Sequence, residues 1–97
     1  MKKDVTIDKI KDKISPVLRD HDVAKAGIFG SFARGENGKK SDLDVVVEFK
    51  GQKSLLDLAG LKIALEEMLG MKVDVLTYNS LHRLIKRHIM KELVPIL

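Results

Sequence analysis

Apolar residues recur along the chain with two different spacings, and the alternation between these spacings predicts the secondary structure. From Thr6 to Leu18 the spacing is helical, which predicts an amphipathic first helix with Thr6 as its N-cap. Pro16 falls inside this pattern. The helix is therefore expected to kink or to break there, with Ser15 capping a last turn.

Three short apolar segments have the composition and the flanking residues of strands. They are Val23–Phe29, which stops at Gly30, then Leu43–Phe49 and Met71–Tyr78. In the second and third segments aliphatic residues alternate with aspartates, and alternate residues of a strand point to opposite faces. Each of these two strands is therefore expected to have one apolar and one acidic face.

Helices are predicted between and after the strands. Ser31–Arg34 forms a short helix, and residues 54–70 form a longer one. Residues 81–93 form a basic last helix, which Asn79 or Ser80 caps and which ends before Pro95. The long middle helix is expected to bury a stripe of leucines: Leu55, Leu58, Leu61, Leu65 and Leu69.

The order of these elements predicts an α/β fold. Helix, strand, short helix, strand, helix, strand and helix fit a small mixed β-sheet of three or four strands with helices packed on it. With 97 residues, the chain has room for one core, so we expect a single domain over residues 1–97.

The composition excludes several classes of site. The chain has no cysteine, which excludes disulfides, thiolate metal sites and a cysteine nucleophile. We find no stretch of signal-peptide or membrane-spanning character, so the expected location is the cytoplasm, without a membrane.

The net charge of +4 favours anionic ligands, although solvated lysines explain it as well. The aromatic residues Phe29, Phe32, Phe49 and Tyr78 are not interleaved with basic ones, as a base-stacking platform would need. Specific nucleic-acid binding is therefore not expected. The basic last helix could dock an acidic partner or remain solvated.

The segment with the clearest chemistry is the start of the second strand. Asp42 and Asp44 are two residues apart, so they share a face at the rim of the sheet, where two like charges cost free energy unless a cation lies between them. Mg²⁺ is the natural occupant, because it takes oxygen ligands. If the second and third strands are neighbours, Asp74 joins the pair, and three carboxylates can hold two Mg²⁺ ions for phosphoryl or nucleotidyl transfer.

Gly30 and Ser31 follow the first strand and begin a short helix, whose free N–H groups could cradle a triphosphate. Two other interpretations fail on the sequence. A P-loop requires a lysine after Gly35, where the chain has Glu36, and an EF-hand loop starting at Asp42 requires a glycine where Val47 stands.

Taken together, these residues resemble a known family. A Gly-Ser pair, ten residues, Asp-x-Asp and a third acidic residue on a later strand, as in GSFARGE…SDLDVVVEF…VDVL, resemble the polymerase-β-type nucleotidyltransferases. The smallest members, the minimal nucleotidyltransferases, are similar over nearly the whole chain. The resemblance implies the nucleotidyltransferase fold, ATP as substrate and Mg²⁺ as cofactor.

The resemblance also implies roles for individual residues. Gly30 and Ser31 would bind the nucleotide triphosphate, and Arg34 and Ser41 would fit the longer form of the motif, as a phosphate-facing cation and a brace for the aspartate loop. The metal ligands would be Asp42 and Asp44. Asp74 would complete the metal site and help to activate the acceptor hydroxyl.

Such proteins are commonly encoded beside a HEPN-domain ribonuclease, so the resemblance implies an antitoxin that transfers AMP from ATP to a tyrosine of that toxin. Two alternatives stay open. The protein could neutralise its partner by masking it, without catalysis, or it could be one subunit of a two-chain enzyme that adenylylates a small molecule.

Overall fold

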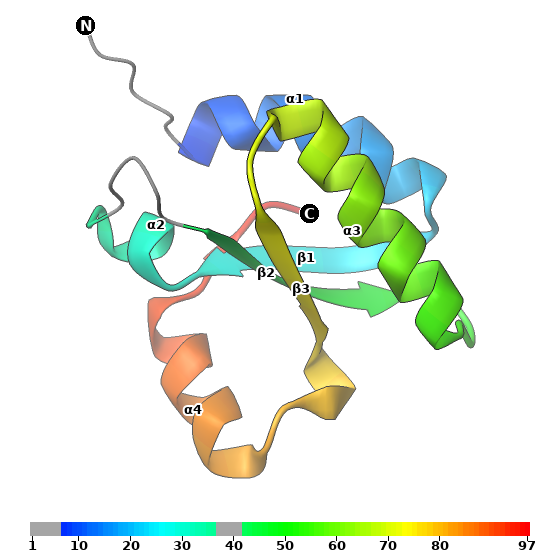
Figure 1. The fold of residues 1–97 in the computed structure, drawn as a ribbon. Coiled ribbons are helices and arrows are strands. Elements are labelled where there is room, and N and C mark those ends of the chain that lie inside the picture. Colours follow the sequence, from blue (N-terminus) through cyan, green and yellow to red (C-terminus); the bar gives the residue numbers. More distant parts are fainter. Residues whose placement is uncertain (1–6, 37–41) are drawn as a thin grey trace, which may run out of the picture.

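The computed structural model describes residues 7–36 and 42–97, and in this part of the chain the strands form one sheet with helices on both sides (Figure 1). The strands are β1 (Val23–Phe29), β2 (Leu43–Phe49), β3 (Val73–Thr77) and β4 (Val94–Pro95). The helices are α1 (Ile7–Asp20), α2 (Ser31–Arg34), α3 (Leu55–Leu69) and α4 (Arg83–Glu92), with a 3₁₀ turn, η1, at Tyr78–Ser80.

The sheet is mixed, as predicted, and its strand order is β3-β2-β1-β4. β1 runs antiparallel to β2 and to β4, whereas β2 and β3 are parallel. A parallel pair needs a crossover connection, which α3 supplies. The two strands that have an aspartate as their second residue, Asp44 in β2 and Asp74 in β3, therefore lie side by side and start at the same end.

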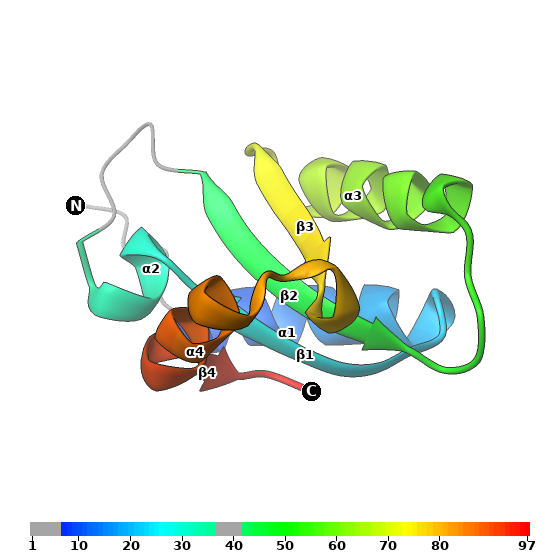
Figure 2. The same cartoon turned by 90° about the horizontal axis from the view of Figure 1, so that it is seen from below.

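One face of the sheet is buried under α1 and α3. Their residues Ile14, Leu18, Leu61 and Leu65 are fully buried, together with the aliphatic face of β2. The other face is covered only in part, by α4, which lies in front of the sheet when α1 lies behind it (Figure 2). Ile89 is the buried residue of α4. The acidic residues of β2 and β3 are on this second face.

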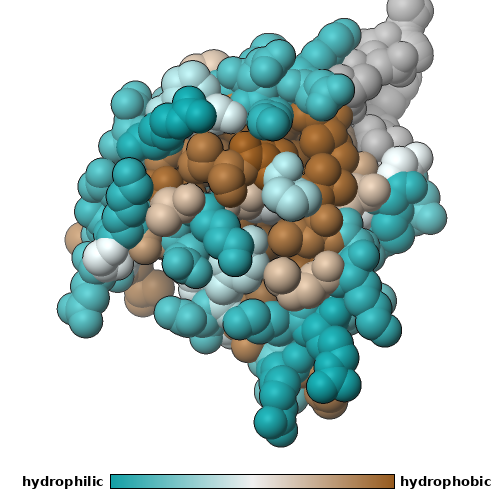
Figure 3. Space-filling view, turned by 180° about the vertical axis from the view of Figure 1, so that it is seen from behind, coloured by the Kyte–Doolittle hydropathy of each residue, from teal (hydrophilic) through white to brown (hydrophobic). Residues whose placement is uncertain are grey.

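β4 forms one edge of the sheet and β3 forms the other. β4 is short and contains Pro95, which removes one backbone donor, a device that limits edge-to-edge pairing. Seen from the β4 side (Figure 3), hydrophobic side chains gather in the middle of the surface and hydrophilic ones surround them. Within residues 7–36 and 42–97 no helix has the length and apolar character that crossing a membrane requires.

The first helix differs from its prediction, because α1 runs without a break through Pro16 to Asp20. Ser15 does not cap a new turn, since its hydroxyl donates to the carbonyl oxygen of Lys11 at 2.6 Å. Ile14 and Leu18, on either side of the proline, are both anchored in the core, which holds the helix together across the lost hydrogen bond. Thr6, the predicted N-cap, lies outside the described residues.

The middle helix begins as predicted and buries less than predicted. Ser54 and Asp57 form a reciprocal capping box at its N-terminus. Leu55 belongs to the predicted stripe, yet it is 83% exposed. The first turn of α3 extends beyond the core, and the stripe packs on it only at the later positions: Leu58, Leu61, Leu65 and Leu69.

The predicted start of the last helix was also wrong. Residues 78–80 form η1, in which the hydroxyl of Ser80 donates to the carbonyl oxygen of Thr77 at 2.9 Å. The N-cap of α4 is instead His82, whose Nδ1 accepts the N–H of Leu84. The third strand is accordingly shorter than predicted and ends at Thr77.

Candidate functional site

The turn after β1 brings the chain back against β2. Gly30 has φ 78° and ψ −152°, a backbone conformation that is essentially restricted to glycine. A Cβ atom at this position would collide with the carboxylate of Asp44. The backbone of the predicted nucleotide loop therefore touches one of the predicted metal ligands.

The short helix α2 has the bounds that the sequence predicts, Ser31–Arg34. Phe32 is buried in the core and fixes the helix to the sheet. Gly35, in the left-handed conformation with φ 71°, ends it. The N–H groups of a first helical turn have no partner within the helix, so those of Ser31 and Phe32 are the candidate donors to a ligand.

The three predicted acidic residues are on one side of the sheet. Asp44 and Asp74 are register partners on the parallel strands β2 and β3, and Asp42 directly precedes β2. Leu43 and Val45, which flank Asp44, point into the core and are fully buried. Alternation along β2 therefore turns the carboxylates away from the core.

Burial and like charges disfavour the ionised form of Asp44, the central member of this group. The pKa of Asp44 is raised, first by burial and then by the charges of Asp74 and Asp42, and the guanidinium of Arg34 offsets only part of this effect. Such a set of hard oxygen donors fits a divalent cation such as Mg²⁺. Within residues 7–36 and 42–97 no three acidic or histidine side chains converge closely enough to enclose a metal ion. Their role as ligands remains a prediction.

Two residues that the sequence analysis did not select hold the start of β3. The carboxylate of Glu66 accepts the N–H of Val73 at 3.0 Å, and the ammonium group of Lys62 donates to the carbonyl oxygen of Val73 at 2.7 Å and to Glu66 at 2.9 Å. The hydrogen bonds from the N–H of Val73 and from the ammonium group of Lys62 lower the pKa of Glu66. Because Val73 directly precedes Asp74, these contacts fix the backbone beside a predicted catalytic residue.

A third missed residue, Glu92 at the end of α4, contacts the nucleotide loop. Its carboxylate accepts the N–H of Gly30 at 2.7 Å and pairs with Nη1 of Arg34 at 3.2 Å. The N–H of Gly30 and the charge of Arg34 keep the pKa of Glu92 below its usual value. No local pattern indicates this role, because Glu92 and Gly30 are 62 residues apart.

The remaining predicted residues have different outcomes. Arg34 is close to the acidic group but is bonded to Glu36 and Glu92, with Nε of Arg34 2.9 Å from Glu36. Arg34 therefore lies at the site, as predicted for a phosphate-facing cation, but its guanidinium is paired with two carboxylates. Ser41, the predicted brace of the aspartate loop, lies outside the described residues.

Comparisons with known proteins identify the family. The profile of a family described as a nucleotidyltransferase domain matches residues 7–96. The chain belongs to this nucleotidyltransferase family. A relative from Methanocaldococcus jannaschii, provisionally named a protein adenylyltransferase, is 55% identical over 96% of this chain and 100% of its own length.

Solved structures show the same fold. This nucleotidyltransferase matches a structure provisionally named a minimal nucleotidyltransferase with a TM-score of 0.79, at 35% identity, over 88% of this chain and 87% of that one. It also matches a chain in the complex of a tri-AMPylated HEPN toxin of Shewanella oneidensis with an MNT antitoxin. Here the TM-score is 0.72 at 19% identity, over 91% of this chain and 69% of that one. At this identity the second likeness concerns the fold alone.

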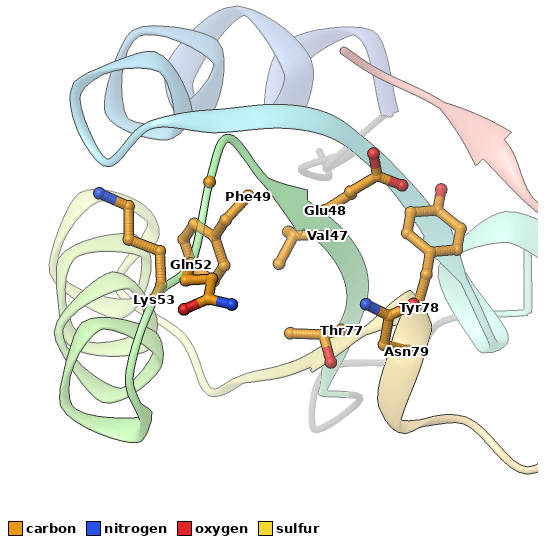
Figure 4. A pocket seen from close by; sticks show the side chains of 9 residues that line it. Val47, Glu48, Phe49, Gln52, Lys53, Thr77, Tyr78 and Asn79 are labelled. Carbon is orange, nitrogen blue, oxygen red and sulfur yellow. The ribbon is translucent and has the colours of Figure 1, made fainter.

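The nucleotidyltransferase has a further groove at the opposite ends of β2 and β3, with a volume of about 360 Å³. Figure 4 shows Phe49, Gln52, Lys53, Thr77 and Asn79 around it. The hydroxyl of Tyr78 is buried without a hydrogen-bond partner among the described residues, and burial raises the pKa of this tyrosine. Because Asp44 and Asp74 lie at the other ends of these strands, this groove is not part of the acidic site.

Proposed function

We propose that this nucleotidyltransferase uses Mg²⁺ and ATP to transfer AMP to a hydroxyl group of a partner protein, a tyrosine of a HEPN-domain toxin, and thereby acts as an antitoxin in the cytoplasm. The observation that carries the proposal is the contact between Gly30 and Asp44. It joins the loop that would hold the triphosphate to the carboxylates that would hold the metal. The names of the relatives support the adenylyl group and the protein acceptor.

Different residues of the chain would bind the triphosphate, hold the metal ions and orient the acceptor in such a transfer. The first N–H groups of α2, the hydroxyl of Ser31 and the guanidinium of Arg34 would bind the triphosphate. Asp42, Asp44 and Asp74 would hold two Mg²⁺ ions, which when bound supply positive charge for the in-line displacement at phosphorus. Asp74 would orient the acceptor and hold its hydroxyl proton during attack.

The reaction balances with ATP and one hydroxyl group. The acceptor oxygen forms a bond to the α-phosphorus, and the bond between that phosphorus and the bridging oxygen of pyrophosphate breaks. The hydroxyl proton passes to a carboxylate of the site and then to solvent. The products are an AMP ester of the acceptor and pyrophosphate.

The openness of the acidic face favours a protein acceptor. Asp42 and Asp74 are exposed, and small ligands are usually bound in concave sites that bury most of their surface. A protein that docks over this face would bring both the nucleophile and the missing wall of the site.

The test is incubation with labelled ATP, Mg²⁺ and the product of the neighbouring HEPN-domain reading frame, followed by mass spectrometry. We expect AMP on a tyrosine of that protein, and no AMP when Asp74 is changed to Asn. Neutralisation of the toxin without added mass, and equally well by Asp42→Asn protein, would instead establish masking. AMP found only on a small molecule would establish the two-chain alternative.

A further inference from the structure

The position of Glu92 is set by the segment that follows it. Val94 and Pro95 pair with β1, and the side chain of Leu93 packs over Gly27 so closely that a Cβ atom there would lie 2.6 Å from Cδ1 of Leu93. By contrast, α4 exposes Leu84, Ile85 and Met90. The C-terminal strand, more than the helix, therefore holds the Glu92 carboxylate beside the nucleotide loop.

The Glu92 carboxylate makes two kinds of contact: the hydrogen bond from Gly30 is partly shielded from solvent, whereas the ion pair with Arg34 is exposed. It accepts the N–H of Gly30 at 2.7 Å and lies 3.2 and 3.3 Å from Nη1 of Arg34 through its two oxygens. Its side chain is 17% exposed, compared with 65% for Glu36, the other carboxylate on Arg34. Charge-assisted hydrogen bonds are stronger where water is excluded, so the part-buried bond from Gly30 to Glu92 constrains the loop more than the exposed bond from Arg34 to Glu36 does.

Gly30 is held from two sides. Its N–H points to Glu92, and the direction in which a side chain would extend points to the carboxylate of Asp44. Glycine can adopt many backbone conformations besides this one, so contacts from outside the turn are needed to select it. Glu92 therefore stabilises the conformation that places the loop against the acidic group.

Arg34 is oriented by the same carboxylate. Its bonds to Glu36 and Glu92 run through Nε and Nη1, so a phosphate would meet the guanidinium at its remaining donors, chiefly those of Nη2. Arg34 is also within electrostatic range of Asp44. Without Glu92, the attraction between Arg34 and Asp44 would favour a guanidinium that pairs with the carboxylate of Asp44 instead of with a phosphate.

We propose that Glu92 is a positioning residue for the nucleotide: it does not touch the reacting atoms, but it fixes the Gly30 turn and directs Arg34 toward the triphosphate. This inference rests on the proposed function, since it concerns the same site. It assigns a role in ATP binding to the C-terminal segment, which lies on the far side of β1 from the aspartates.

The test compares Glu92→Gln with the matched control Glu36→Gln. Both changes remove a carboxylate partner of Arg34, but only the first also alters the acceptor of the Gly30 N–H. Isothermal titration calorimetry with ATP and Mg²⁺, without an acceptor, should give a Kd about ten-fold higher for Glu92→Gln and changed by less than about two-fold for Glu36→Gln. In the transfer assay, KM for ATP should rise by a similar factor while kcat changes little.

A second readout separates positioning from general stability. In Glu92→Ala the amide proton resonance of Gly30 should shift upfield, while the rest of the NMR spectrum stays dispersed. In Glu92→Gln the thermal midpoint should stay near that of the unmodified protein. Equal ATP affinity in all variants would overturn the inference and leave the proposed function standing. Tighter binding by the Glu92 variants would also overturn it, because the carboxylate would then compete with the phosphates. If the unmodified protein binds no ATP, the proposed function fails as well.

Discussion

On each side of the site a glutamate carboxylate accepts a backbone N–H, but the two glutamates lie at very different sequence separations from their partners. Beside Asp74, the carboxylate of Glu66 accepts the N–H of Val73, and Lys62 completes the contact. Beside the nucleotide loop, the carboxylate of Glu92 accepts the N–H of Gly30, and a cation again completes the contact. The first carboxylate is seven residues from its backbone partner and the second is 62.

Because the two sequence separations differ, the two contacts depend on different parts of the fold. The Glu66 contact forms within one helix and the strand that follows it, so it depends on little else in the fold. The Glu92 contact forms only when the C-terminal strand pairs with β1. We therefore expect the metal side of the site to be locally rigid, whereas the nucleotide side depends on the placement of the last residues of the chain.

The largest expected effect is at Asp44, where the two sides meet. Asp44→Asn should reduce AMP transfer to background, because it removes a charged ligand from the proposed metal site while keeping the shape. In metal-free buffer the thermal midpoint should hold or rise. The pKa of Asp44 is raised, which means that its ionised form is unfavourable in the folded protein at neutral pH, and asparagine relieves that cost.

Mass spectrometry of the acceptor and a thermal melt measure these two effects. Glu48→Gln is the matched control, since Glu48 is on the same face of β2 four residues later and is exposed. An Asp44→Asn protein that still transfers AMP at near the unmodified rate would contradict the metal assignment.

The second largest effect is expected at Gly30, on the nucleotide side. Gly30→Val should abolish ATP binding, since a side chain there meets the Asp44 carboxylate and crowds the approach of the phosphates. The strained backbone should also cost about 1–3 kcal/mol of unfolding free energy. Calorimetric ATP titration and chemical denaturation measure the two losses. Gly51→Val is the control, because Gly51 also has a positive φ but faces open space. It should lose stability without losing ATP binding.

Much of the fold was predictable because its signals are local. Val23–Phe29, Ser31–Arg34 and Leu43–Phe49 have the predicted bounds, since glycine punctuation and strand alternation act within a few residues. The alternation of Asp44 with buried valines also predicted the face on which the acidic residues lie. Pro16 misled the prediction, because tertiary packing of Ile14 and Leu18 outweighs the lost helical hydrogen bond.

The supports of the site were not predictable to the same extent. Lys62 and Glu66 have the spacing of an ordinary surface pair on a helix, and only the fold shows that both reach Val73. Glu92 is part of a basic helix, and nothing in its sequence neighbourhood distinguishes it from an ordinary surface charge. Its role depends on β4 pairing with β1, a contact that no local pattern in the sequence encodes.

A smaller effect, on stability, is expected at Glu66. Glu66→Gln should lower the thermal midpoint by a few degrees and leave ATP affinity nearly unchanged, in contrast to Glu92→Gln. Hydrogen bonding lowers the pKa of Glu66 below its usual 4.5. Its stabilisation is therefore present at pH values above about 4.5 and is lost as the pH falls through the lowered value of the folded state. Melts from pH 7 to pH 3 should show the two proteins converging at the acid end. A gap that stays constant over this range would contradict the electrostatic explanation.

The smallest effect is expected at Ser31, and it sharpens the contrast between backbone and side chain on the nucleotide side. Ser31→Ala removes one hydroxyl but keeps the N–H groups of the first turn of α2, so the Kd for ATP should rise only about two- to ten-fold. Ser54→Ala is the matched control, because this change also removes a serine hydroxyl from the start of a helix. It opens the capping box of α3 and should lower stability while leaving the Kd unchanged. If Ser31→Ala weakened ATP binding as severely as Gly30→Val, the hydroxyl rather than the backbone would be the main phosphate ligand. The triphosphate would then lie farther along α2 than we propose.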